Sequence, residues 1–249
     1  MIRKATAHRI RVLFLLPATV CLLLALAACV QVEQTLSLNP DGSGTIDITY
    51  GMPEEGAAQM ASFLGSGLSS GEDGLDGAAV ASPFDFNDED VRKDFREYEA
   101  DGVVLESVKT ETREGWRYRR MVIRFRDLAG LARTGFLSEH NVSLTRDAAG
   151  RYVFVQSAGS NGAAEDLPRA DPALNAWLKG FRAVLRLRTP SRILETNAPE
   201  HNDRQATWTF DVDHDPEALQ KAQRTSMRAV FEGQGVSIPD FKCVADSDR

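Results

Sequence analysis

The chain has 249 residues, a hydrophobic content of 43% and a formal net charge of −7 at pH 7. This length is sufficient for one large domain, or two small ones, with a core of its own. An acidic surface repels nucleic acid and anionic membranes alike, so the composition argues against a nucleic-acid-binding protein.

The amino terminus has the pattern of a secretory signal peptide. It opens with basic residues and no acidic ones, and an apolar run from Val12 to Ala28 follows. The run ends on the small residues Ala27 and Ala28, as a cleavage site does. Residues 1–28 are therefore expected to be removed and to play no part in the fold. The alternative is an uncleaved membrane anchor, because the run is near the length that spans a bilayer.

The residues Leu26-Ala27-Ala28-Cys29 resemble the lipobox of bacterial lipoproteins. In such proteins the cysteine thiol accepts a diacylglycerol and the peptide bond before it is cut, here between Ala28 and Cys29. Two or three acyl chains hold a protein firmly on a membrane. We therefore expect an exported chain that is anchored to the membrane through lipid on Cys29. Because Val30 rather than aspartate follows, the resemblance implies the periplasmic side of the outer membrane in a Gram-negative cell, and otherwise the outer face of the cytoplasmic membrane.

The mature chain opens with a predicted β-hairpin. Apolar residues alternate with polar ones over 30–38 and 46–50, and residues 39–44 (NPDGSG) between them are dense in turn formers. The first strand follows Cys29 without a spacer, so the domain is expected to lie close to the membrane surface. A later stretch, 65–82, is rich in Gly, Ser and acidic residues and is predicted to be a mobile loop.

Short helices and strands alternate along the rest of the chain. Asn87 or Asp88 is expected to cap a helix that ends near Glu99. The last helix is predicted to begin around Pro216 and to continue through Val230. Helical periodicity also predicts helices at 54–65, 128–133 and 174–181. Alternating apolar residues predict strands at 103–110, 116–126, 142–144, 152–155, 183–189, 193–194 and 205–212.

This order of elements predicts an α+β fold, with a curved antiparallel sheet and helices packed mainly on one face. Strands outnumber helices, and short turns join most neighbours. A single domain is expected over 29–235, and residues 236–249 are expected to form a polar tail. Removal of Cys21 and acylation of Cys29 would leave Cys243 as a lone thiol, so no internal disulfide is predicted.

No motif marks a metal site or a catalytic centre. The pattern D-x-D-x-D-x-E begins at Asp211, but a calcium-binding loop needs glycine sixth and glutamate twelfth, where this chain has Pro216 and Ala222. We interpret the pattern as a strand end that leads into a helix cap. No known arrangement of nucleophile and base is present either. We therefore expect no metal, no cofactor and no catalytic residue, and predict that the protein is not an enzyme.

Two predicted strands are rich in arginine. Arg117, Arg119 and Arg124 are candidates for a surface that faces lipid head groups or an acidic partner. The simpler interpretation is a solvated sheet face on which arginines pair with nearby acids. The arginines of the two strands are Arg117, Arg119, Arg120, Arg124 and Arg126 in the first, and Arg186 and Arg188 in the second.

Two stretches resemble the LppM-like family of bacterial lipoproteins. One is CVQVEQTLSLNPDGSGT, which begins at Cys29, and the other is TPSRILETNA, which begins at Thr189 and precedes a strand with tryptophan. Asn197 and Trp208 are the positions that match the family pattern. The resemblance implies an envelope lipoprotein with an antiparallel α+β domain that holds lipid or glycolipid in a cavity. From the residues alone, Asn197 is a turn residue and Trp208 a core residue.

These observations predict a non-catalytic, lipid-anchored envelope protein that binds an apolar ligand or lipid. The first alternative is a protein-interaction or assembly lipoprotein that uses loop 65–82 or the arginine strands. The second is a hydrolase with an unrecognised site. An enclosed apolar cavity favours ligand binding, whereas a filled core with an exposed apolar patch favours protein interaction. A cleft with titratable groups of shifted pKa favours the hydrolase.

The lipid anchor is open to a direct test by mass spectrometry of the mature protein from its host. We expect a chain that begins at Cys29 and carries the mass of an acylated cysteine. An unmodified chain that begins before residue 29 would contradict the assignment.

Overall fold

The computed structural model describes residues 30–54, 87–134, 137, 140–158 and 180–243. The predicted signal peptide, Cys29 and the loop 65–82 lie outside these residues, and so do nearly all of the helices expected at 54–65 and 174–181.

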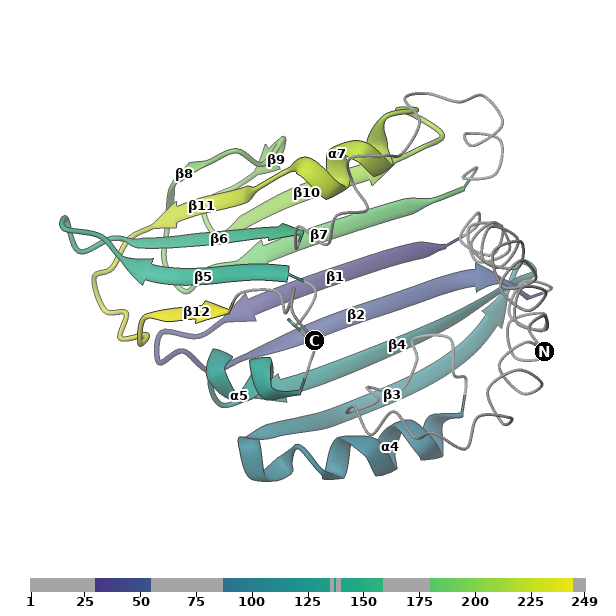
Figure 1. The fold of residues 1–249 in the computed structure, drawn as a ribbon. Coiled ribbons are helices and arrows are strands. Elements are labelled where there is room, and N and C mark those ends of the chain that lie inside the picture. Colours follow the sequence, from purple (N-terminus) through teal and green to yellow (C-terminus); the bar gives the residue numbers. More distant parts are fainter. Residues whose placement is uncertain (1–29, 55–86, 135–136, 138–139, 159–179, 244–249) are drawn as a thin grey trace, which may run out of the picture.

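Two β-sheets make up most of the described structure (Figure 1). Sheet A has seven strands in the order β3-β4-β2-β1-β7-β10-β9, and sheet B has five in the order β12-β5-β6-β11-β8. The strands of sheet A are β1 (Gln31–Leu38), β2 (Gly44–Pro53), β3 (Val103–Arg113), β4 (Trp116–Phe125), β7 (Arg182–Arg188), β9 (Glu200–His201) and β10 (Gln205–Asp211). Those of sheet B are β5 (His140–Arg146), β6 (Tyr152–Ala158), β8 (Ile193–Thr196), β11 (Met227–Phe231) and β12 (Phe241–Cys243).

Short helices border the sheets. They are α4 (Asp88–Arg96), the 3-10 helix η1 (Glu99–Asp101), α5 (Leu128–Arg133) and α7 (Ala218–Arg224). Helix α4 packs along β3, α5 contacts β4 and β12, and α7 contacts β10 and β6. Within the described ranges, none of the helices has the length and hydropathy needed to span a bilayer.

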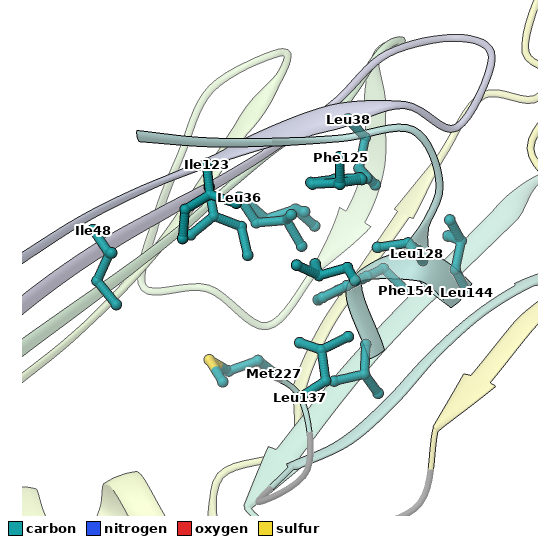
Figure 2. Close-up of a cluster of buried hydrophobic side chains, with 14 of the residues drawn as sticks. Leu36, Leu38, Ile48, Ile123, Phe125, Leu128, Leu137, Leu144, Phe154 and Met227 are labelled. Atoms are coloured by element: carbon teal, nitrogen blue, oxygen red, sulfur yellow. The ribbon is translucent and has the colours of Figure 1, made fainter. Parts of the chain in front are cut away.

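The predicted α+β class is confirmed, but the strands form two sheets rather than one. The inner faces of both sheets share a single core, which Figure 2 shows with Leu36 and Ile123 of sheet A near Phe154 of sheet B. Burial of each such side chain stabilises the fold by about 1.5–3 kcal/mol. The sheets are also not wholly antiparallel, because β1 pairs with β7 in parallel, with Gln31 opposite Arg182. The other strand pairs within the described ranges are antiparallel.

Local chemistry accounts for several element boundaries. In the β1–β2 turn, Asp41 accepts hydrogen bonds from the backbone N–H and the hydroxyl of Ser43, and Gly42 has a φ of 88°. Asn87 caps α4 by accepting from the backbone N–H of Glu89 at 3.0 Å. Asp127 caps α5 by accepting from the backbone N–H of Gly130 at 2.6 Å.

The carboxy-terminal third differs from the prediction in two ways. Helix α7 ends at Arg224, and Met227 and Val230 belong to strand β11 rather than to the helix. In addition, residues 236–243 are not part of a polar tail. Val236 and Ile238 are buried, and β12 pairs with β5 at the edge of sheet B. The folded domain therefore extends beyond the predicted boundary at residue 235.

A buried tyrosine holds this carboxy-terminal segment in place. Tyr152 is 1% exposed, and its ring stacks on Phe231 with 5.5 Å between ring centroids. Its hydroxyl donates to the carbonyl of Ile238 at 3.1 Å and accepts from the backbone N–H of the same residue at 2.9 Å. The backbone N–H and the carbonyl of Ile238 are thus both hydrogen-bonded to the Tyr152 hydroxyl.

The substitution Tyr152→Phe is expected to lower the free energy of unfolding by about 1–3 kcal/mol, because it leaves buried backbone groups without partners. Urea denaturation measures this change. Tyr118→Phe is the matched control, since its hydroxyl is only half-buried and forms a long hydrogen bond of 3.4 Å. An equal loss in the two variants would contradict the role given to Tyr152.

Candidate functional site

The three arginines predicted to form one surface do not do so. Arg119 is fully buried and faces the core with Met121, whereas Arg124 lies on the outer face of sheet A. Arg124 pairs with Glu106 at 2.9 Å. Arg117 is half-buried on the same side as Arg119. The prediction of a shared ligand surface is therefore wrong, because strand alternation sends these side chains to opposite faces.

Arg119 instead holds α4 against sheet A. Its Nη2 atom lies 3.3 Å from Oδ1 of Asp88, the first residue of the helix. The hydroxyl of Thr110 on β3 donates to the same oxygen at 2.7 Å, and Nε of Arg119 lies 3.4 Å from that hydroxyl. This is a structural contact that joins a helix start to two strands.

The outer face of sheet A has a polar hollow of about 350 Å³, lined by residues of β1, β2, β3, β4 and β7. Arg120 donates to both carboxylate oxygens of Asp47, at 2.9 and 2.6 Å. Glu33 accepts from Arg182 and Arg186, each at 3.0 Å. Burial alone would raise the pKa of Glu33, but the two guanidinium groups outweigh it and lower the pKa. These pairs match the simpler interpretation of the arginine strands, a solvated face with its charges paired.

The two residues that carried the family resemblance are in direct contact. The indole Nε1 of Trp208 donates to Oδ1 of Asn197 at 3.3 Å, and the backbone N–H of Arg228 donates to the same oxygen at 2.8 Å. The amide Nδ2 of Asn197 donates to the carbonyl of Ser226 at 2.7 Å. Asn197 therefore joins β10 of sheet A to the start of β11 of sheet B.

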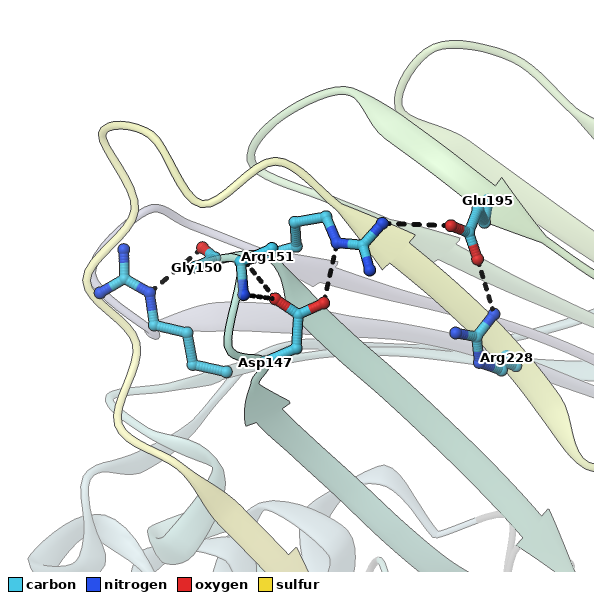
Figure 3. Close-up of polar contacts among 7 residues, drawn as sticks. Asp147, Gly150, Arg151, Glu195 and Arg228 are labelled. Atoms are coloured by element: carbon cyan, nitrogen blue, oxygen red, sulfur yellow. Dashed lines mark hydrogen bonds and ion pairs between the residues drawn. The ribbon is translucent and has the colours of Figure 1, made fainter.

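A chain of ion pairs continues from Arg228 across sheet B, as Figure 3 shows. Arg228 contacts Glu195 at 3.3 Å, and Glu195 contacts Arg151 at 3.2 Å. Arg151 contacts Asp147 in the β5–β6 turn at 2.8 Å. Asp147 also accepts from the backbone N–H of Arg151, and these contacts lower the pKa of its carboxyl. Exposed pairs of this kind each contribute little to the stability of the fold.

Trp208 and Asn197 line a pocket of about 630 Å³ beside α7, which we name the Trp208 pocket. This volume lies in the range of small-molecule sites. The apolar lining comes from the inner face of β10, the start of α7 and the segment after β8. The apolar residues are Trp208, Phe210, Ala218 and Pro199, of which the first three are buried.

Charged residues of both signs surround the apolar lining. Lys221 lies 2.6 Å from Asp215, and this hydrogen bond raises the pKa of the lysine and lowers that of the aspartate. Burial alone would raise the pKa of Asp211, but the contact with His214 at 3.1 Å and the backbone hydrogen bonds from Asp213 and His214 together outweigh it and lower the pKa. Arg182 lies 3.6 Å from Asp211. The rim is thus balanced in charge.

The Trp208 pocket lies at the end of sheet A where β1 begins. Gln31 pairs with Arg182 across β1 and β7, and Arg182 pairs with Asp211 across β7 and β10. Adjacent strands are about 4.8 Å apart, so Asp211 lies roughly 10 Å from Gln31. The carbonyl of Val30 accepts from the backbone N–H of Arg182 at 3.2 Å. The pocket rim is therefore close to the point where the chain leads to Cys29.

The two sheets pack closely against each other beside Trp208. The gap beside Phe154, Leu187 and Trp208 measures only about 10 Å³, which is close to the volume one water needs. Among the described side chains, no group of three His, Cys, Asp or Glu lies in a metal-binding arrangement. The acidic residues Asp211 and Asp215 of the D-x-D-x-D-x-E pattern instead accept backbone hydrogen bonds before α7, as the interpretation of a strand end leading into a helix expects. The candidate site is thus an open pocket and not an enclosed cavity.

Sequence reasoning found part of this pocket and missed the rest. Asn197 and Trp208 were found through the motif that begins at Thr189. Phe210 shares the inner face of β10 with Trp208, and the alternation of that strand was a sufficient signal. Arg182 and Lys221 were missed, because no pattern indicates that β7 and α7 lie on either side of β10.

No family model matches the chain, and no curated protein sequence matches it. A search of solved structures finds similarity to the folded domain of LppM from Mycobacterium tuberculosis, determined by NMR. The two share 13% sequence identity with a TM-score of 0.43, over 82% of this chain and 89% of that domain. The proposals for this chain are carried by its own residues.

The contact of Asn197 with Trp208 is open to a graded test. Asn197→Ala removes the acceptor for two N–H groups and is expected to lower the free energy of unfolding by about 1 kcal/mol, with a shift in tryptophan emission. Asn197→Asp keeps the acceptor and is expected to have a smaller effect in urea denaturation. Equal effects of the two variants would show that the acceptor oxygen does not matter.

Proposed function

We propose that this chain is a cell-envelope lipoprotein, anchored through acylated Cys29, whose folded domain binds an amphipathic, lipid-like molecule in the Trp208 pocket without catalysis. The observation that carries the proposal is that the apolar-lined Trp208 pocket lies at the end of sheet A where β1 begins, close to the expected anchor. A ligand taken from the bilayer would have a short path to this pocket.

The lining suits a molecule with an apolar chain and a polar head. Trp208 and Phe210 offer aromatic surface, and burial of apolar area against such rings drives binding. The rim carries Arg182 and Lys221 together with Asp211 and Asp215. A head group that carries both charges, such as phosphoethanolamine, pairs with such a rim better than a purely anionic one does.

The charges of the pocket also support a binding role rather than acid–base catalysis. A general acid or base works best with a pKa near the operating pH. The pKa values of Asp211 and Asp215 are lowered instead, which holds both carboxyls ionised. Their hydrogen bonds serve the turn and the ion pair with Lys221.

Native mass spectrometry of the full mature chain, with phosphatidylethanolamine added as the probe, tests the pocket. Thr225→Phe places a ring in the pocket at the end of α7 and is expected to weaken binding about tenfold, a loss of 1.4 kcal/mol. Thr49→Phe is the matched control, since Thr49 lines the polar hollow on the outer face of sheet A.

Binding by the Thr49 variant is expected to equal that of the unmodified sequence. Unchanged binding by the Thr225 variant would rule out the Trp208 pocket as the site. A stronger preference for phosphatidylglycerol than for phosphatidylethanolamine would contradict the assigned head-group chemistry.

A further inference from the structure

Two aromatic rings and an arginine lie at the end of sheet A from which the chain leads to Cys29. Tyr118 pairs with Gly51, and Gly51 pairs with Gln31, so the three residues lie in one row across β4, β2 and β1. The hydroxyl of Tyr118 also reaches Oε1 of Gln31, at 3.4 Å. Two peptide units separate Gln31 from Cys29, which places their Cα atoms within about 7 Å of each other.

Close packing fixes the position of these rings. Tyr118 lies across Gly51 so tightly that a Cβ atom on the glycine would be 2.5 Å from the ring. Trp116 stacks beside Tyr118, with 6.1 Å between centroids and 21° between planes. The guanidinium carbon of Arg113 lies 4.3 Å from the centre of the Tyr118 ring. The set of Arg113, Trp116 and Tyr118 is named the aromatic cluster.

Trp116 lies nearest to the end of the sheet. It pairs with Pro53 on one side and with Arg113 on the other, two residues beyond the row of Gln31. Arg113 is exposed, and within the part of the chain that the structure describes it has no ion pair. Trp116 and Tyr118 are half-buried.

These residue types suit the boundary between water and lipid. Tryptophan and tyrosine combine an apolar ring with one polar group, and they concentrate at the level of lipid head groups. Arginine extends its charge to phosphate while its stem covers apolar surface. Gln31 lies in the same row as Tyr118 and is only two residues from the lipid attachment site. The lipid anchor therefore leaves little room between the aromatic cluster and the bilayer.

We infer that the aromatic cluster contacts the head-group layer of the membrane that holds Cys29 and thereby fixes how the domain stands on it. This end of sheet A faces the bilayer, and the strands lead away from it. The inference rests on the lipid anchor of the proposed function but not on the Trp208 pocket. The partner is the bilayer surface itself.

The test uses the full lipidated chain reconstituted into phosphatidylethanolamine vesicles, with or without phospholipid brominated on its acyl chains. Bromine quenches tryptophan only at short range. All chains carry Trp177→Phe, because Trp177 lies outside the described residues. The chain that keeps Trp116 is expected to lose fluorescence in brominated vesicles, and Trp116→Phe is expected to lose that quenched component. Trp208 lines the pocket proposed to bind lipid, so it is kept in every chain, and any quenching of it is a common background against which position 116 is compared. Far-ultraviolet circular dichroism checks that each variant is folded.

A matched control moves the tryptophan along the same face of the same strand. Arg124→Trp in the Trp116→Phe background places the ring eight residues farther along β4, roughly 27 Å from the original position. This variant is expected to show no quenching by brominated lipid beyond that of the Trp116→Phe chain.

Each outcome separates the two claims. Equal quenching of the chain that keeps Trp116 and of the Trp116→Phe chain, both shown by mass spectrometry to be acylated on Cys29, would overturn the inferred orientation and leave the anchor intact. Equal quenching of a tryptophan at position 116 and of one at position 124 would also overturn it. A chain without lipid on Cys29 would overturn the anchor of the proposed function and this inference with it.

Discussion

The parallel pairing of β1 with β7 is the interaction on which the rest of the structure depends. It joins the β1–β4 half of sheet A to β10 and β9, which come from the far end of the chain. With β1 held on both sides, the inner apolar residues of the whole sheet face sheet B and complete one core. The same pairing sets Gln31, Arg182 and Asp211 in one row, so the start of β1 and the pocket rim share one end of the domain.

Much of the local structure was predictable, because it depends on short-range chemistry. The turn at 39–44, the cap at Asn87 and the bounds of α5 follow from side chains that bond to backbone groups a few positions away. Met227 and Val230 misled the helix prediction, because their spacing of three fits a helical face. Thr225 takes an extended conformation that ends the helix, and tertiary pairing with β6 makes the segment a strand.

The features that were missed are those in which distant segments meet. Nothing near β1 indicates that its second neighbour is β7, and nothing near Ile238 indicates that Tyr152 binds it. Arg119 shows the same limit in a different form. A charged side chain is expected at the surface, but the alternation of side chains along β4 points Arg119 inward. There it contacts Asp88 of α4 and Thr110 of β3. Asn197 and Trp208 were identified by motif alone, and their contact joins the two sheets.

The position of β1 in the middle of sheet A has a consequence for the order of folding. Strands β1 and β2 form one hairpin and β3 and β4 form another, so each of these pairs has only a short loop to close. The outer edge of β1 then offers unpaired backbone groups until β7 has been synthesised and can dock. During that interval the open edge is a template for pairing with another copy. Because the chain is synthesised from its amino end, the arrival of β7 is the step that closes this open edge.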